Sequence, residues 1–196
     1  MKLFRIALIS VGTFLILLIA AYVVIKRAQE SQGQLPVLFT LPQFEFTGRN
    51  GEPFSRDDFL DKISVVDFFF TNCPGPCPRM SARMAELYQL YASTEQVQFV
   101  SISVDPGRDS LSVLRDYAQR FGVTDQRWQF LRAPIEEVID LYEKGFRLGG
   151  MLPADHSTKF ILIDEKARIR GYYDSLDDIS FSILKSHVRE LARQLP

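Results

Sequence analysis

The chain has 196 residues, which fits one compact domain with a tail. With 23 basic and 24 acidic residues its formal net charge is −1, and this balance argues against a nucleic-acid-binding surface. Sixteen Phe and seven Tyr favour a packed core and argue against a disordered chain.

The first predicted element is a membrane-spanning helix at residues 6–25, an uncharged run that reads IALISVGTFLILLIAAYVVI. Its length matches the roughly 20 residues that cross a bilayer core. A cleaved signal peptide is the alternative, but its apolar region would be only about 7–15 residues long. We therefore predict an uncleaved anchor over residues 1–27. Basic residues flank the run on both sides, so the charges do not set its orientation.

A polar tether is predicted at residues 28–34, and one folded domain over residues 35–196. This domain opens with apolar and polar residues in alternation, followed by an Asn-Gly turn signal at Asn50. Such a pattern predicts a small β-hairpin. A turn of helix is expected next, near residues 57–60.

Strands and helices then alternate. Residues 64–71 read SVVDFFFT, which predicts a central strand buried on both faces of a sheet. Apolar residues at helical spacing predict a helix that begins near Cys77. The remaining predicted elements are strands at 97–104 and 128–131, helices at 111–121, from Pro134 and at 177–194, and an edge hairpin of strands 158–163 and 169–173. This order predicts a mixed α/β sheet with helices on both faces, for which a thioredoxin-like fold is the best match.

The chain has only two cysteines, Cys73 and Cys77, which enclose Pro74-Gly75-Pro76 between the central strand and the next helix. Two thiols this close can form a disulfide or bind a soft metal ion. Free N–H groups at a helix start stabilise a thiolate, so at least one thiol is predicted to be reactive. The usual thioredoxin redox motif has two intervening residues rather than three. The spacing therefore leaves redox and metal functions open, together with an inert structural disulfide.

A third ligand would favour a metal site, and His156 is the best candidate. It lies just before strand 158–163. In thioredoxin-like domains the loop before this strand lies against the cysteine loop, so the separation in sequence is no obstacle. His187, the only other histidine, lies in the final helix without a partner motif and is not assigned to the site.

Three segments carry these motifs: residues 73–78 read CPGPCP, residues 103–109 read SVDPGRD and residues 155–158 read DHST. Together with the N-terminal apolar run they resemble the Sco/SenC family of copper-binding proteins, which help assemble the binuclear copper centre of cytochrome c oxidase. The resemblance covers nearly the whole chain, and the combination of segments is specific. The chain departs from the family at Gly75-Pro76, where a branched or acidic pair is common.

The resemblance implies that Cys73, Cys77 and His156 bind one copper ion, as Cu(I) or Cu(II). It places the domain on the extracytoplasmic side of the cytoplasmic membrane, behind a single anchor. The implied partners are the copper-bearing subunit of cytochrome c oxidase, other copper chaperones and thiol-disulfide reductants. No nucleic-acid partner is expected.

Two functions stay open. The chain is either a copper metallochaperone or a membrane-anchored thiol-disulfide oxidoreductase that uses Cys73 and Cys77 without copper transfer. A peroxide-reducing thiol enzyme would share the fold, but nothing else in the sequence supports it. His156 discriminates between the first two, because copper binding requires it and disulfide exchange does not.

Five further residues have alternative interpretations. Met80 and Met84 are possible thioether ligands, but their helical spacing favours core packing. Asp67, inside the apolar strand, either tunes proton transfer to the thiols or pairs with a neighbour. Asp105 and Asp109 either orient the site or meet a partner, or else they cap the following helix.

Overall fold

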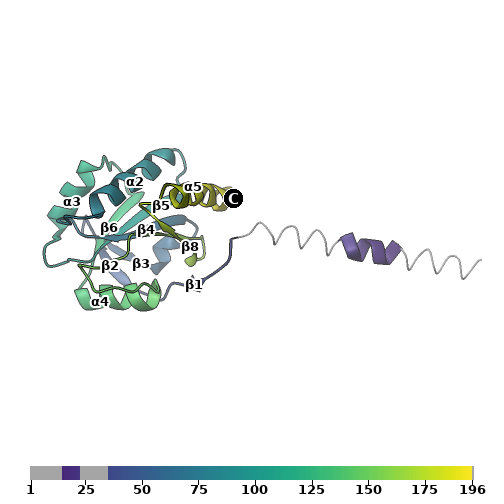
Figure 1. Cartoon of the computed structure of the whole chain (residues 1–196), viewed down its shortest axis with the longest axis horizontal. Helices are drawn as coiled ribbons and strands as arrows, with labels where there is room; N and C mark the ends of the chain where they lie inside the picture. Colours follow the sequence, from purple (N-terminus) through teal and green to yellow (C-terminus); the bar gives the residue numbers. More distant parts are fainter. Residues whose placement is uncertain (1–14, 23–34, 196) are drawn as a thin grey trace, which may run out of the picture. The chain divides into compact units, whose positions relative to one another are not determined.

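A computed structural model of the chain describes residues 15–22 and 35–195 (Figure 1). Residues 15–22 form a helix. Within these two ranges no helix is both long enough and apolar enough to cross a membrane. The predicted span at 6–25 falls largely on residues outside the described ranges, and the predicted tether falls there entirely. Pro36–Pro196 form a compact unit of their own.

An eight-stranded mixed sheet forms the centre of this unit, in the order β1-β8-β7-β4-β5-β6-β2-β3. The strands are β1 (Phe39–Thr40), β2 (Glu45–Gly48), β3 (Pro53–Ser55), β4 (Ile63–Phe69), β5 (Val97–Ser103), β6 (Trp128–Arg132), β7 (Lys159–Ile163) and β8 (Arg168–Asp174). Strands β4, β5 and β6 pair in parallel, and all other neighbouring pairs are antiparallel. Every residue of β4 is buried, which confirms the predicted central strand.

Helices cover both faces of the sheet. They are the 3-10 turn η1 (Arg56–Phe59), α2 (Cys77–Leu90), α3 (Leu111–Arg120), α4 (Ile135–Asp140), the π-helical η2 (Leu141–Gly145) and α5 (Asp178–Ala192). In Figure 1, α2, α3 and α5 lie on one side of the sheet and α4 lies on the other. This arrangement agrees with the predicted thioredoxin-like fold.

Three details differ from the prediction. The β7–β8 hairpin is not at the sheet edge, because β1 pairs with the outer side of β8. With two residues, β1 is too short for its sequence to show alternation. Strand β4 ends at Phe69, so Phe70 and Thr71 belong to the cysteine loop. The helix predicted from Pro134 changes into a π-helix at Leu141, where the Phe146 amide donates to the Leu141 carbonyl at 2.9 Å.

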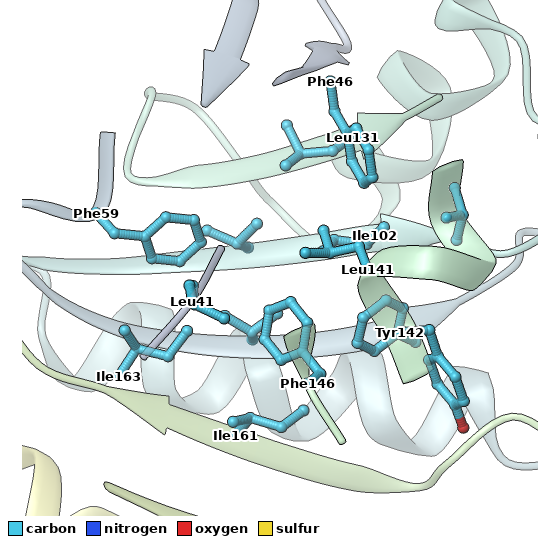
Figure 2. Packing of buried hydrophobic residues seen from close by; sticks show 14 of the residues in the cluster. Leu41, Phe46, Phe59, Ile102, Leu131, Leu141, Tyr142, Phe146, Ile161 and Ile163 are labelled. Atoms are coloured by element: carbon cyan, nitrogen blue, oxygen red, sulfur yellow. The ribbon is translucent and has the colours of Figure 1, made fainter. Parts of the chain in front are cut away.

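One apolar cluster fills the space between the sheet and the α4–η2 segment. Figure 2 shows Ile102 and Ile161 of the sheet packed near Leu141 and Phe146. The Phe68 ring makes edge contacts with Tyr142 and Phe146, at centroid distances of 4.8 and 5.1 Å. Burial of each such side chain contributes about 1.5–3 kcal/mol. The cluster thus fixes the end of β4, from which the cysteine loop departs.

Candidate metal centre

The cysteine loop runs from the end of β4 to the start of α2. Cys77 is the first residue of α2 and is fully buried, whereas Cys73 in the loop is partly exposed. The Cys73 amide donates to the Phe70 carbonyl at 3.3 Å, and the Gly75 amide donates to Cys73 Sγ at 3.4 Å. These bonds turn the loop tightly, so that the two thiols lie at one end of the sheet.

His156 reaches this loop from the segment before β7. Its side chain is 8% exposed, and its Nε2 atom lies 3.3 Å from Cys77 Sγ. The other ring nitrogen, Nδ1, lies 3.2 Å from the Ser157 carbonyl oxygen. A carbonyl oxygen can only accept, so this contact holds the proton on Nδ1 and leaves the Nε2 lone pair directed at the thiols. The Phe70 ring meets the imidazole edge-on at 5.6 Å.

The three predicted residues therefore come together. Cys73 Sγ, Cys77 Sγ and one nitrogen of His156 all lie within 4.8 Å of one another. Two thiolates and a neutral imidazole form a soft donor set that suits copper or zinc better than magnesium or calcium. Since Cys73 is partly exposed and the other two donors are buried, the set has one side accessible from solvent.

Burial sets the protonation of the two inner donors. It raises the pKa of the Cys77 thiol, and the hydrogen bond with Cys73 raises it further. The helix start therefore does not by itself make Cys77 a thiolate, and the prediction that at least one of the two thiols is reactive stays a prediction. Burial also lowers the pKa of His156, against the opposing effect of its bond to Ser157. A neutral imidazole is the form that binds metals.

Asp109 stabilises the exit of β4 rather than a helix. Its buried carboxylate accepts hydrogen bonds at 2.5 Å from the hydroxyls of both Thr71 and Ser103. The Thr71 amide donates to the same carboxylate at 3.4 Å. Thr71 precedes Cys73 by two residues, so Asp109 ties the cysteine loop to the end of β5.

Helix capping by Asp105 or Asp109 is wrong, because Ser110 is the N-cap of α3 and its hydroxyl accepts from the Val113 amide. Asp105 instead forms an ion pair with the exposed Arg108 at 3.2 Å. Among the described residues, Asp105 has no hydrogen bond or ion pair with the cysteine loop. Of the two acidic residues, only Asp109 is thus linked to the candidate centre.

Asp67 lies inside the core of the domain. It is fully buried in β4, opposite Ser101 of β5. Neither carboxylate oxygen has a hydrogen-bond partner among the described residues. Burial raises the pKa of Asp67 to about 7, an effect that the nearby Ser101 offsets only in part. The charge of Asp67 in turn contributes to the raised pKa of Cys77.

The other candidates are structural. Met80 and Met84 are fully buried in α2, which confirms that they belong to the core. His187 Nδ1 lies 2.7 Å from the Tyr173 hydroxyl, and the two rings are also in contact. His187 does not belong to the group of donors formed by Cys73, Cys77 and His156 among the described residues.

Comparison with known proteins agrees with this geometry. A protein-family model described as SCO1/SenC matches residues 34–192. The chain belongs to the SCO1/SenC family. The matched residues include all three donors of the candidate centre.

Solved structures of Sco proteins have the same fold. A SCO1/SenC family lipoprotein from Bacillus anthracis is 31% identical, with a TM-score of 0.71 over 79% of this chain and 95% of that chain. BsSco, described as having a disulfide switch and as a member of the Sco family of cytochrome c oxidase assembly proteins, is 24% identical, with a TM-score of 0.74 over 83% and 98%. Yeast Sco1 with copper bound is 25% identical, with a TM-score of 0.61 over 79% and 90%.

Several residues that support the donors in this Sco protein were missed from the sequence. Phe70 contacts the imidazole, Thr71 binds Asp109, and the Tyr142 hydroxyl binds the Ser157 amide at 2.8 Å. Asp109 itself was singled out from the sequence, because it lies in the SVDPGRD segment. Tyr142 gave no signal, because a tyrosine at helical spacing is typical of any core.

Proposed function

We propose that this protein is a copper metallochaperone that binds one copper ion through Cys73, Cys77 and His156. The observation that carries the proposal is the approach of three soft or borderline donors to within 4.8 Å, from two loops far apart in the chain. Thiolates select Cu(I), and imidazole binds copper in either oxidation state. Copper here is the cargo that the protein hands on.

The asymmetry of burial suits delivery. Cys77 and His156 are buried on the inner side, and Cys73 is partly exposed. A recipient ligand can therefore approach copper from the Cys73 side and replace the donors one at a time. We propose that the recipient is the copper-bearing subunit of cytochrome c oxidase. Yeast Sco1 with copper bound and the description of BsSco as a member of an oxidase assembly family support this choice.

A second candidate function is thiol-disulfide exchange, which the same asymmetry favours. The Cys73 thiolate would attack one sulfur of a recipient disulfide, forming a mixed disulfide and releasing the other sulfur as a thiolate. Cys77, after losing its proton, would then attack Cys73 and release the second recipient thiolate. The protein becomes a disulfide and the recipient gains two electrons. The disulfide switch named for BsSco supports this candidate.

Location is part of the same proposal. We propose that residues 6–25 anchor the protein in the cytoplasmic membrane and that the Pro36–Pro196 unit lies on the extracytoplasmic side. Copper delivery to a membrane oxidase fits such a location.

Transfer assays with a purified copper-bearing oxidase fragment separate the two functions. Copper-loaded protein is offered to the reduced fragment, and reduced copper-free protein is offered to the disulfide form. A metallochaperone transfers copper in the first assay, and His156→Ala abolishes this transfer while His187→Ala does not. An oxidoreductase reduces the disulfide in the second assay, with or without His156. Failure of copper transfer by the wild type, together with rapid disulfide reduction, would favour the oxidoreductase.

A further inference from the structure

One hydroxyl group, that of Tyr142, forms hydrogen bonds with both ends of the segment that carries His156. Tyr142 donates this hydroxyl to the Gly149 carbonyl at 3.0 Å and accepts the Ser157 amide at 2.8 Å. One side chain therefore binds both ends of the segment 149–157. Burial raises the pKa of Tyr142, so the phenol stays protonated and available as a donor at neutral pH.

Between these two attachments the segment folds back on itself. The Asp155 amide donates to the Met151 carbonyl at 2.8 Å. Gly150 has a φ of +129°, and a Cβ atom at this position would lie 2.0 Å from the Asp155 carbonyl oxygen. The turn is therefore tight, and it presents His156 next to the bond between Ser157 and Tyr142.

Tyr142 itself is held firmly. Its ring is fully buried and packs edge-on against Phe68 of β4, the strand that leads to Cys73. In Figure 2 its hydroxyl oxygen points away from the apolar cluster. The π-helical turn that carries Tyr142 is closely packed at Gly145, where a Cβ atom would lie 2.7 Å from Leu141 Cδ1 and 3.1 Å from Pro42 Cδ. The hydroxyl is thus fixed relative to the strand that positions the cysteines.

Ser157 connects Tyr142 to the metal-binding side chain of His156. Its amide binds Tyr142, and its carbonyl oxygen lies 3.2 Å from His156 Nδ1. Nε2 then faces Cys77 Sγ at 3.3 Å. A continuous series of contacts joins Phe68, Tyr142, Ser157 and His156, and it ends at the thiols.

We propose that Tyr142 is a positioning residue for His156, and that its hydroxyl allows the centre to retain Cu(II) as well as Cu(I). This inference rests on the proposed copper site. The two thiolates are the dominant soft ligands for Cu(I), to which the imidazole adds less, whereas Cu(II) prefers tetragonal sites with nitrogen or oxygen ligands. A loosened imidazole therefore weakens Cu(II) binding selectively.

The test compares Tyr142→Phe with Tyr172→Phe in the full-length protein. Tyr172 is a matched control, because its hydroxyl also donates to a backbone carbonyl beside the same cluster, that of Phe146 at 2.9 Å. Release of Cu(II) is measured by competition with a chelator, and the thiolate-to-copper charge-transfer band reports the ligand geometry. Hydrogen exchange of the Ser157 amide is measured in the copper-free protein.

We expect Tyr142→Phe to release Cu(II) roughly 10–100-fold faster, the effect typical of lost partners around a metal ligand, with a shifted charge-transfer band. Its affinity for Cu(I) should change by less than about threefold, because the two thiolates stay in place. The Ser157 amide should exchange at least about tenfold faster, because it loses its hydrogen-bond acceptor and the loop opens more readily. Tyr172→Phe should match the wild type in both copper measurements. If Tyr142→Phe does not fold, Ser157→Pro replaces it in the test. This variant removes the N–H group that donates to the Tyr142 hydroxyl, and it should show the same selective loss of Cu(II).

Two results would overturn the inference: unchanged Cu(II) release despite faster Ser157 exchange, or equal losses of Cu(I) and Cu(II). With either result, the proposed copper site would still be supported if His156→Ala loses Cu(II). Absence of copper binding in the wild type would overturn the proposed function, and the inference with it.

Discussion

Cys77 Sγ and His156 Nε2 lie 3.3 Å apart, although 79 residues separate the two side chains in the chain. Cys77 begins α2, and His156 precedes β7. Strand β7 pairs with β4, so the sheet itself brings the two loops to the same end of the domain. The contact is therefore a consequence of strand order, and the bond of Nδ1 to Ser157 and the ring contact with Phe70 orient the imidazole.

The first prediction concerns protons. Burial raises the pKa of Cys77, so this thiol is protonated at neutral pH, yet only its thiolate binds copper. Copper binding to the reduced protein should therefore release at least one proton, and its apparent affinity should rise by about tenfold per proton and pH unit. Calorimetry at pH 7 in buffers of different ionisation enthalpy measures this release. An affinity that does not change between pH 6 and pH 8 would contradict it.

The second prediction concerns the order of the two thiols. Cys73 is partly exposed and Cys77 is buried, so a thiol-alkylating reagent should modify Cys73 first. We expect a difference of at least about tenfold in rate, because Cys73 is more accessible and burial raises the pKa of Cys77. Mass spectrometry of the partly alkylated full-length protein gives the ratio directly. Equal labelling of the two residues would show that the cysteine loop opens readily.

The third prediction concerns Asp109. Removal of its carboxylate leaves the donors of Thr71 and Ser103 without their acceptor, which costs about 1–3 kcal/mol of unfolding free energy. Asp109→Ala should also weaken copper binding, because Thr71 precedes Cys73 by two residues. Denaturant unfolding and copper titration measure the two effects.

Asp105→Ala serves as the matched control, since it removes only an ion pair with the exposed Arg108 in the same turn. Such a pair contributes about 0–1 kcal/mol. If Asp105→Ala and Asp109→Ala weakened copper binding equally, a specific role of Asp109 would be excluded.

The fourth prediction concerns stability against pH. Burial raises the pKa of Asp67 to about 7, so the folded protein keeps this proton at pH values where the unfolded chain loses it. The folded state binds more protons than the unfolded state between about pH 4 and pH 7, and its stability falls as the pH rises through this window.

Asp67→Asn removes this contribution. Its stability relative to the wild type should increase by roughly 2–4 kcal/mol between pH 4 and pH 8, since each pKa unit corresponds to 1.36 kcal/mol. Unfolding in urea at the two pH values tests this. A constant difference between the two proteins would mean that Asp67 titrates normally in the folded state.

Much of this structure is predictable from local patterns. The buried run of β4, the Asn-Gly turn before β3 and the helical spacing after Cys77 are strong signals, and the elements lie where these signals place them. The donors were found because cysteine and histidine are rare in this chain. What the sequence does not show depends on tertiary contacts. The edge strand β1 has two residues, and its existence depends on pairing with β8.

The protonation of Cys77 is a second example. A helix start by itself favours a thiolate. In the structure neighbouring residues cover Cys77 completely, and this burial raises the pKa of its thiol. Complete burial of Cys77 depends on how the surrounding loops pack over it, and a local sequence pattern does not predict this packing.

The most direct test of the copper site is an anaerobic copper titration of the reduced full-length protein, with X-ray absorption spectroscopy to identify the ligand atoms. Cys73→Ser, Cys77→Ser and His156→Ala are compared with His187→Ala, which alters the only other histidine. We predict one tightly bound copper with sulfur and nitrogen ligands, weakened in the first three variants and unchanged in the fourth. Wild-type protein that folds but binds no copper, or that binds it equally well without His156, would contradict the three-donor copper site.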